Sequence, residues 1–210
     1  MRYYLADCHF FHGNLNDRMD CRGFSSEEEM NEYMIEKWNA KVRKRDEVVI
    51  LGDFSLGNVE ETTALLGRLQ GKLHLILGNH DHVMEHKRMD LSRFEWVKRY
   101  AELSDNGRKV VLCHYPIFCY NGQYRIDKEG KAGTYMLYGH VHNTYDEKLV
   151  TRFIDITRKS TVKLVNEEET RNIPCQMINC FCKYSDYTPL SLDEWIELDR
   201  KRKESLRNPT

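Results

Sequence analysis

LHLILGNHD, residues 73–81, is the stretch of this 210-residue chain that decides its fold. A mostly apolar, strand-like run leads directly into a glycine, an asparagine, a histidine and an aspartate. Four other apolar runs end in residues of the same kind: YYLADCH (3–9), VVILGD (48–53), VVLCH (110–114) and YMLYGHVH (135–142). Open α/β sheets bind ligands beyond the carboxyl ends of their strands, because loops from several strands converge there. The pattern therefore predicts an α/β fold with polar groups gathered at one sheet edge.

Seven side chains at these strand ends are of types that bind divalent metals. They are Asp7, His9, Asp53, Asn79, His114, His140 and His142. Residues two apart on an extended chain point the same way, so Asp7 with His9 can address a common centre. Oxygen ligands mixed with imidazoles suit Mn, Fe, Zn or Ni. Seven ligands exceed one tetrahedral site, and a carboxylate shared between two ions, as in two-metal hydrolases, accommodates them.

The composition limits the class of protein. The length favours a single domain spanning residues 1–210. A net charge of −1 supplies no overall field for nucleic acid or an anionic membrane, and we find no long Lys/Arg block that would replace it. No run approaches the roughly 18 apolar residues of a membrane span. Seven cysteines, an odd number at irregular spacing, disfavour a disulfide framework and predict a cytoplasmic protein.

The periodicity of the remaining residues predicts helices and further strands. Capping-box pairs, Ser25 with Glu28 and Ser191 with Glu194, mark the starts of a helix reaching about residue 42 and of a terminal helix. Residues 105–107, Asp-Asn-Gly, have the chemistry of a hairpin turn. The other expected elements are helices over 60–69 and 83–94, strands over 95–103, 109–112, 153–156 and 175–183, and either a strand or a charged excursion over 161–169.

A long connection, Tyr115–Thr134, separates His114 from the next strand. Loops of this length inside a compact domain are more often functional than idle, so we expect a lid over the site, with a plain surface excursion as the alternative. Arg125 in this loop is a candidate substrate contact. His12, three residues beyond His9, is a second candidate, with a structural or solvated histidine as the alternative.

The ordered blocks resemble the calcineurin-like metallophosphoesterase superfamily. They are Asp7-x-His9, Gly52-Asp53, Gly78-Asn79-His80-Asp81, His114 and Gly139-His140-x-His142. All five follow the family's order from the N-terminus to residue 142, which is far more specific than one such block. The stretch from FFHGN through EEMNEYMIEKWN to LGDFSLG also resembles a subgroup of small bacterial and phage members without accessory domains.

The resemblance implies a fold and a set of roles. The implied fold is a four-layer α-β-β-α sandwich of two mixed sheets, with a dinuclear metal site at the carboxyl edge of the strands. The implied ligands are Asp7, His9 and His142 for one ion and Asn79, His114 and His140 for the other, with Asp53 bridging both. A metal-bridging hydroxide would attack the phosphate. His80 would protonate or steady the leaving group, and Asp81 would orient His80.

Two departures from the family pattern bear on the substrate. The second block reads GDFSLG, so it lacks the arginine of the GD-x-x-D-R-G block in phosphoprotein serine/threonine phosphatases, and the third reads GNHD rather than GNHE. Phosphoprotein substrates are therefore disfavoured. We expect an enzyme that hydrolyses a phosphodiester or nucleotide-type small molecule. The alternatives are a phosphomonoesterase acting on small metabolites, a nuclease, and a non-catalytic metal-binding scaffold of the same fold.

Overall fold

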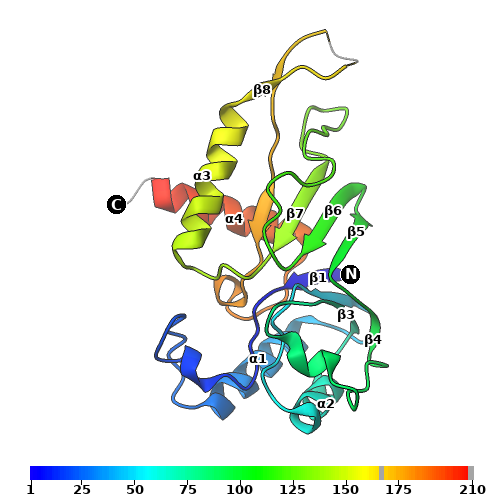
Figure 1. Ribbon diagram of the computed structural model, residues 1–210, viewed down its shortest axis with the longest axis vertical. Coiled ribbons are helices and arrows are strands. Elements are labelled where there is room, and N and C mark those ends of the chain that lie inside the picture. Colours follow the sequence, from blue (N-terminus) through cyan, green and yellow to red (C-terminus); the bar gives the residue numbers. More distant parts are fainter. Residues whose placement is uncertain (166–167, 208–210) are drawn as a thin grey trace.

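The computed structural model describes residues 1–165 and 168–207, in which two four-stranded sheets and four α-helices form the body and one two-stranded sheet is added (Figure 1). The first sheet contains β1 (Arg2–Leu5), β2 (Glu47–Ile50), β3 (Lys72–Ile76) and β4 (Phe94–Lys98) in that order. All of its neighbouring strands are parallel. The expectation that both sheets are mixed is therefore wrong for the first sheet. Each connection between its strands returns the chain to the same end of the sheet, so that every strand runs in the same direction.

The second sheet is mixed. Its order is β10 (Met177–Asn179), β7 (Thr134–Tyr138), β6 (Arg108–Cys113) and β5 (Tyr100–Asp105). The predicted hairpin joins β5 to β6 antiparallel, and the other pairs are parallel. The single strand expected over 95–103 is in fact two, because the chain leaves the first sheet after β4 and enters the second at β5. A short antiparallel pair, β8 (Thr161–Val162) with β9 (Arg171–Asn172), lies beyond α3.

Side-chain capping sets where the helices begin. In α1 (Glu27–Lys41) the N-cap is Ser26, whose side chain accepts from the Glu29 N–H, one residue later than the predicted pair. Asn58 and Glu61 form a full capping box on α2 (Val59–Arg68). The predicted Ser191–Glu194 pair is present at the start of α4 (Leu192–Arg207), where the two residues exchange hydrogen bonds. Each such cap contributes about 1 kcal/mol by satisfying backbone N–H groups that have no partner inside the helix.

Four expected elements differ in the structure. Residues 153–156 lie inside α3 (Tyr145–Lys159), where Val150 and Ile154 recur at helical spacing and are buried. The helix expected over 83–94 is only a short 3-10 turn, Asp81–Glu85. The strand expected over 175–183 is reduced to β10. Within 161–169 only β8 is a strand, and residues 166 and 167 fall outside the described residues.

The core lies between the two sheets and extends to both sets of helices. Side chains of β6 and β7 alternate: Val110 and Leu112 join the cluster that contains the first sheet, α1 and α2, while Val111 faces the cluster that contains α3. Burying one such aliphatic side chain contributes about 1.5–3 kcal/mol. This packing holds the carboxyl ends of β1, β2, β3, β6 and β7 in fixed positions. Among the described helices, we find none with the length and apolar content needed to cross a membrane.

The connection Tyr115–Thr134 lies along the second sheet. Since β6 and β7 are parallel, it has to carry the chain back from one end of the sheet to the other. Tyr120 is buried, and its hydroxyl accepts from the Gln176 N–H at 2.7 Å. Asn121 donates to Glu102 of β5. These contacts fix the middle of the connection against the sheet, away from the metal-ligand edge.

Candidate metal centre

The seven predicted ligands lie at the carboxyl ends of five strands, and a sharp backbone turn positions most of them. Five have left-handed backbone conformations, with φ of 56° at Asp7, 49° at His9, 52° at Asp53, 70° at His140 and 46° at His142. This region costs an L-residue roughly 1–2 kcal/mol. Here the left-handed conformation turns the backbone just after each strand, so that the side chains converge. At Gly78, a Cβ atom would collide with the Asp53 carboxylate, so only glycine fits beside that ligand.

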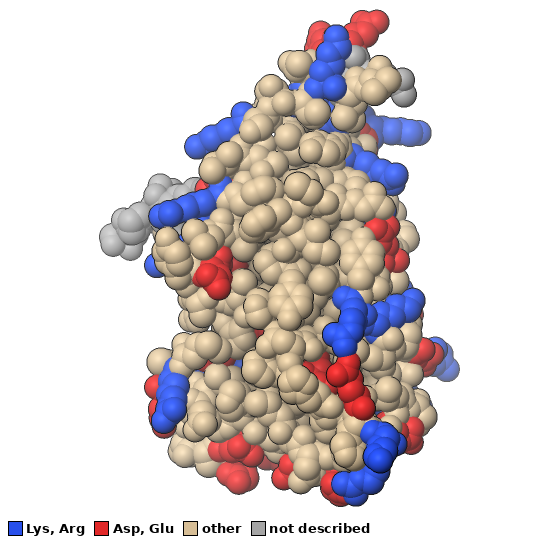
Figure 2. All heavy atoms as spheres, viewed as in Figure 1, with Lys and Arg blue, Asp and Glu red and all other residues tan. Residues whose placement is uncertain are grey.

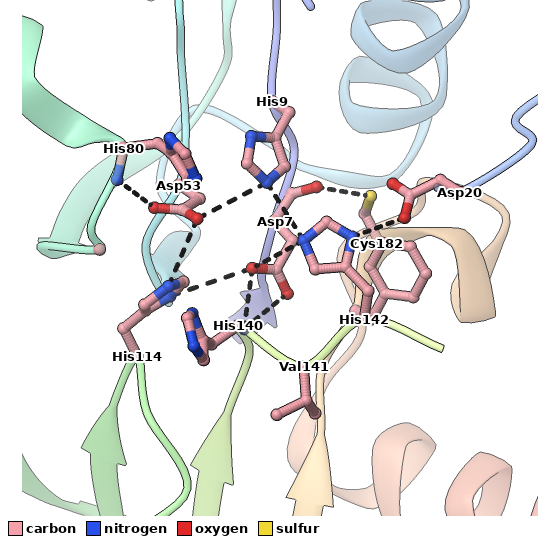
Figure 3. A network of polar contacts seen from close by, with 12 residues as sticks. Asp7, His9, Asp20, Asp53, His80, His114, His140, Val141, His142 and Cys182 are labelled. Carbon is pink, nitrogen blue, oxygen red and sulfur yellow. Dashed lines mark hydrogen bonds and ion pairs between the residues drawn. The ribbon is translucent and has the colours of Figure 1, made fainter. Parts of the chain in front are cut away.

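One group of ligand atoms comes from the segments that follow β1 and β7. Asp7, His9 and His142 are all buried, and their ligand atoms lie within 4.8 Å of one another (Figure 3). Nε2 of His142 is 3.2 Å from Nε2 of His9 and 3.7 Å from Oδ1 of Asp7. We call these three residues the first cluster.

A second group forms around the Asn79 amide. Its Oδ1 lies 3.1 Å from Nε2 of His114 and 2.9 Å from Nδ1 of His140. We call these three residues the second cluster. The other ring nitrogen of His114 is 2.8 Å from the Leu51 carbonyl oxygen, which accepts its proton and leaves Nε2 facing the cluster.

Asp53 lies between the two clusters. Its Oδ2 is 3.6 Å from Nε2 of His9 and 3.4 Å from Nε2 of His114. Its Oδ1 accepts from the backbone N–H of His80 at 2.8 Å. One oxygen of this carboxylate therefore faces both clusters while the other is held by the backbone (Figure 3).

The electrostatics of the site favour a cation. Burial raises the pKa of Asp7 to about 6 and lowers the pKa of His9 to about 2. Burial opposes ionisation of Asp53 and His114 as well, but the hydrogen bond between them moves the pKa of Asp53 to about 2 and that of His114 to about 9. Two buried carboxylates among imidazole nitrogens and an amide oxygen are a donor set that borderline divalent ions accept. The residues present therefore fit a metal centre.

His80 and Asp81 have different surroundings. His80 is exposed, and its ring centroid lies 5.5 Å from that of His9, beside the first cluster. The buried carboxylate of Asp81 accepts from the backbone N–H groups of Gly78, Asp53 and Phe54 at 2.7, 2.9 and 2.8 Å. The expected contact with the His80 ring is thus replaced by three backbone contacts. Asp81 joins the loops after β2 and β3, which carry Asp53 and Asn79.

The two predicted substrate contacts end up in different places. The ring centroid of His12 lies 5.6 Å from that of His9, so the structure brings it next to the first cluster. Arg125 exchanges backbone hydrogen bonds with Gly122 and Gly133 just before β7 begins, at the end of the strand opposite to His140. The five residues of β7, roughly 17 Å, separate it from the site. The prediction for Arg125 is therefore wrong. The expected lid over Tyr115–Thr134 is not formed by the middle of the connection, but its first residue does lie at the site, because the Tyr115 ring centroid is 4.5 Å from that of His140 and 5.1 Å from that of His114.

A functional group that the motif blocks do not include lies behind His142. Asp20 is buried, and its Oδ1 is 2.6 Å from Nδ1 of His142. Asp20 belongs to the polar segment between β1 and α1. No spacing rule links it to a histidine 122 residues further along the chain.

Comparison with known proteins places this geometry in a family. A profile described as "Calcineurin-like phosphoesterase superfamily domain" matches residues 5–166. The chain belongs to the calcineurin-like phosphoesterase superfamily. All seven candidate ligands of this phosphoesterase, together with His80 and Asp81, fall within the matched residues. The family membership supports hydrolase chemistry and metal binding.

Similar proteins of comparable extent occur in an archaeon and in phages. An uncharacterized protein of Methanocaldococcus jannaschii is 32% identical over 204 residues, which cover 96% of this chain and 92% of that protein. The gene 66 protein of Mycobacterium phage D29 is 29% identical over 197 residues, covering 81% and 94%. The crystal structure of a protein of unknown function from Aquifex aeolicus superposes with a TM-score of 0.62 at 19% identity, covering 94% and 98%, and so shares the fold. The resemblance to small phage-type phosphoesterases is confirmed.

Proposed function

We propose that this phosphoesterase hydrolyses a phosphodiester or nucleotide-type small molecule with the help of two divalent ions. The observation that carries the proposal is the position of Asp53, whose Oδ2 lies 3.6 Å from a nitrogen of the first cluster and 3.4 Å from one of the second. A carboxylate in this position suits a ligand shared between two ions. The first cluster would hold one ion and the second cluster the other.

The residues of the chain divide the work between binding and proton transfer. When bound, the ions would supply Lewis-acid charge for the phosphate oxygens and lower the pKa of a coordinated water. His80 and His140 are exposed, whereas Asp7, His9, Asp53, His114 and His142 are buried. The substrate would therefore approach from the side of His80 and His140. His80 is then placed to donate a proton to the departing oxygen, and His12 to line the same side.

The charge distribution on the face drawn in Figure 2 supports a small substrate over a nucleic acid. Figure 2 shows one face, on which the Lys and Arg side chains of the described residues are scattered, mostly near the outline, among Asp and Glu, while uncharged residues cover the middle. A nuclease depends on a basic groove that follows the phosphate backbone. This face offers no such groove among the described residues.

The central test is hydrolysis by the wild-type protein. With Mn²⁺ added, we expect turnover of an aryl phosphodiester such as bis(p-nitrophenyl) phosphate, measured by release of nitrophenolate, and loss of that turnover after treatment with a chelator. Matched monoester kinetics would separate the diesterase from the phosphomonoesterase alternative. If elemental analysis finds bound metal but a broad phosphoester panel gives no turnover, the scaffold alternative replaces this proposal.

His80→Ala is expected to slow the reaction according to the leaving group. A general acid contributes about 10²–10⁴-fold when the departing oxygen needs a proton, and little when it leaves as a stable anion. The variant should therefore lose most of its kcat on an alkyl phosphodiester but less than about tenfold on a nitrophenyl ester. His86→Ala, at an exposed histidine outside both clusters, is the control. An equal loss on both substrates would contradict the role of His80 as a proton donor.

The proposal also includes the wider architecture. The shared core between the sheets, with α1 and α2 packing on the first and α3 on the second, supports the four-layer α-β-β-α arrangement in one domain over 1–210. The seven cysteines are all free, which suits a reducing, cytoplasmic compartment.

A further inference from the structure

A buried ion pair lies directly behind the first cluster. The side chains of Asp20 and Arg22 both have no exposed surface. Oδ2 of Asp20 accepts from Nε and Nη2 of Arg22 at 3.0 and 2.9 Å. Its other oxygen, Oδ1, faces Nδ1 of His142 at 2.6 Å (Figure 3). One oxygen of the Asp20 carboxylate thus contacts an arginine and the other a histidine.

Arg22 ties this pair to the segment after β1, which carries the other ligands of the cluster. Its Nη1 donates to the Cys8 carbonyl at 2.6 Å, and its Nη2 donates to the Asp7 carbonyl at 2.9 Å. Lys183 donates to the backbone carbonyls of Asp20 and Cys21 and so fixes the turn that contains the carboxylate. A buried ion pair is costly unless its hydrogen bonds are completed, and here they are completed by the backbone of the ligand loop itself.

We infer that Asp20 is a positioning residue for the metal ligand His142, and that Arg22 holds Asp20 in place. The inference rests on the metal centre proposed above. An ionised carboxylate only accepts hydrogen bonds, so Nδ1 of His142 must carry the proton. Nε2 then keeps its lone pair and points at the cluster, 3.7 Å from Oδ1 of Asp7. Carboxylates behind metal-binding histidines fix the ring and its tautomer in this way.

His9, in the same cluster, provides an internal comparison. Its Nδ1 is buried and has no hydrogen-bond partner among the described residues. The two imidazoles of the first cluster therefore differ on the side that faces away from the cluster: Nδ1 of His142 meets a charged pair, and Nδ1 of His9 meets no hydrogen-bond partner among the described residues. Loss of Asp20 should act on the ion of the first cluster through His142 and leave the second cluster unchanged.

Asp20→Asn is the sharpest test, because the amide has almost the same shape as the carboxylate. Its single oxygen can accept from Arg22 or from His142 but not from both, and its NH₂ group would donate to Nδ1 of His142. The proton would then move to Nε2 and block the metal-binding lone pair. Titration of the metal-free protein with Mn²⁺, followed by calorimetry, should show one of two binding events weakened about 10–100-fold and the other unchanged. Asp17→Asn, an exposed carboxylate in the same segment, should bind like wild type.

A second readout does not depend on the variant folding. In the metal-free wild-type protein, the ¹⁵N NMR signals of His142, assigned with a His142→Gln variant, should show the proton on Nδ1. A neutral His142 ring with its proton on Nε2 and none on Nδ1, or a folded Asp20→Asn protein with unchanged Mn²⁺ affinity, would overturn the inference. Neither measurement uses turnover. A failure of the proposed hydrolysis would thus leave these results standing, and a failure here would leave the hydrolysis standing.

Discussion

Replacing Asp53 with alanine is expected to lower phosphate-ester turnover by more than about a thousandfold, which corresponds to at least about 4 kcal/mol of barrier. The carboxylate lies between the two clusters, so its removal takes a ligand atom from both. The loss should therefore appear in kcat and in metal content together.

The Asp53→Ala experiment needs metal analysis beside the kinetics. Turnover would be measured at increasing Mn²⁺, with bound metal determined by elemental analysis of the same samples. Asp17→Ala, which removes an exposed carboxylate from the segment that contains Asp20, should keep wild-type activity. Full recovery of turnover at high Mn²⁺ would mean that Asp53 contributes only to affinity and has no role once the ions are bound.

Asp81→Ala is expected to lower the free energy of unfolding by at least about 3 kcal/mol. The carboxylate satisfies three backbone N–H groups in a buried site, and hydrogen bonds to a charged acceptor contribute roughly 1.5–3 kcal/mol each, without full additivity. Removing it leaves those three N–H groups without this acceptor and releases the loops that carry Asp53 and Asn79. Turnover should fall as a consequence of the displaced ligands.

Urea unfolding of the metal-free protein measures this loss without the contribution of bound ions. Asp90→Ala is the matched control, because Asp90 also accepts from a backbone N–H, at 2.8 Å from Ser92, but in an exposed turn. It should cost less than about 1 kcal/mol. An Asp81→Ala protein of wild-type stability that shows the same leaving-group effect as His80→Ala would contradict this structural role. It would instead support the role expected from the sequence, in which Asp81 orients His80.

The sequence was sufficient to predict the features that depend on residues close together along the chain. β1, β2, β3, β6 and β7 each coincide with an expected apolar run, and all seven ligand positions follow from the residue types at their ends. The left-handed turns that complete the geometry are short-range features of the same segments. The convergence of two clusters on Asp53 could be anticipated because parallel strands bring their carboxyl ends to one edge.

What could not be predicted depends on contacts between distant segments. Asp20 reads as an ordinary polar loop residue until β7 and its loop bring His142 to it. Arg125 looked like a phosphate contact because its loop follows a ligand, but the parallel pairing of β6 and β7 takes the loop back to the opposite end. Asp81 adjoins His80 in sequence, yet the turn points its carboxylate at the backbone of the neighbouring strand end. In the segment 153–156, β-branched and aromatic residues suggested a strand, and packing of one helix face overrode that preference.

The left-handed backbone at Asp7, His9, Asp53, His140 and His142 limits how the metal preference of this centre can be redesigned. Asp, Asn and His enter that region more readily than other side chains, so the conformation and the coordination chemistry select the same few residue types. A cysteine introduced at one of these five positions to favour a softer ion would have to adopt the left-handed backbone conformation as well as the geometry that the ion requires. Asn79 and His114 lie outside the left-handed group. At these two positions a new ligand type would not have to adopt a left-handed backbone.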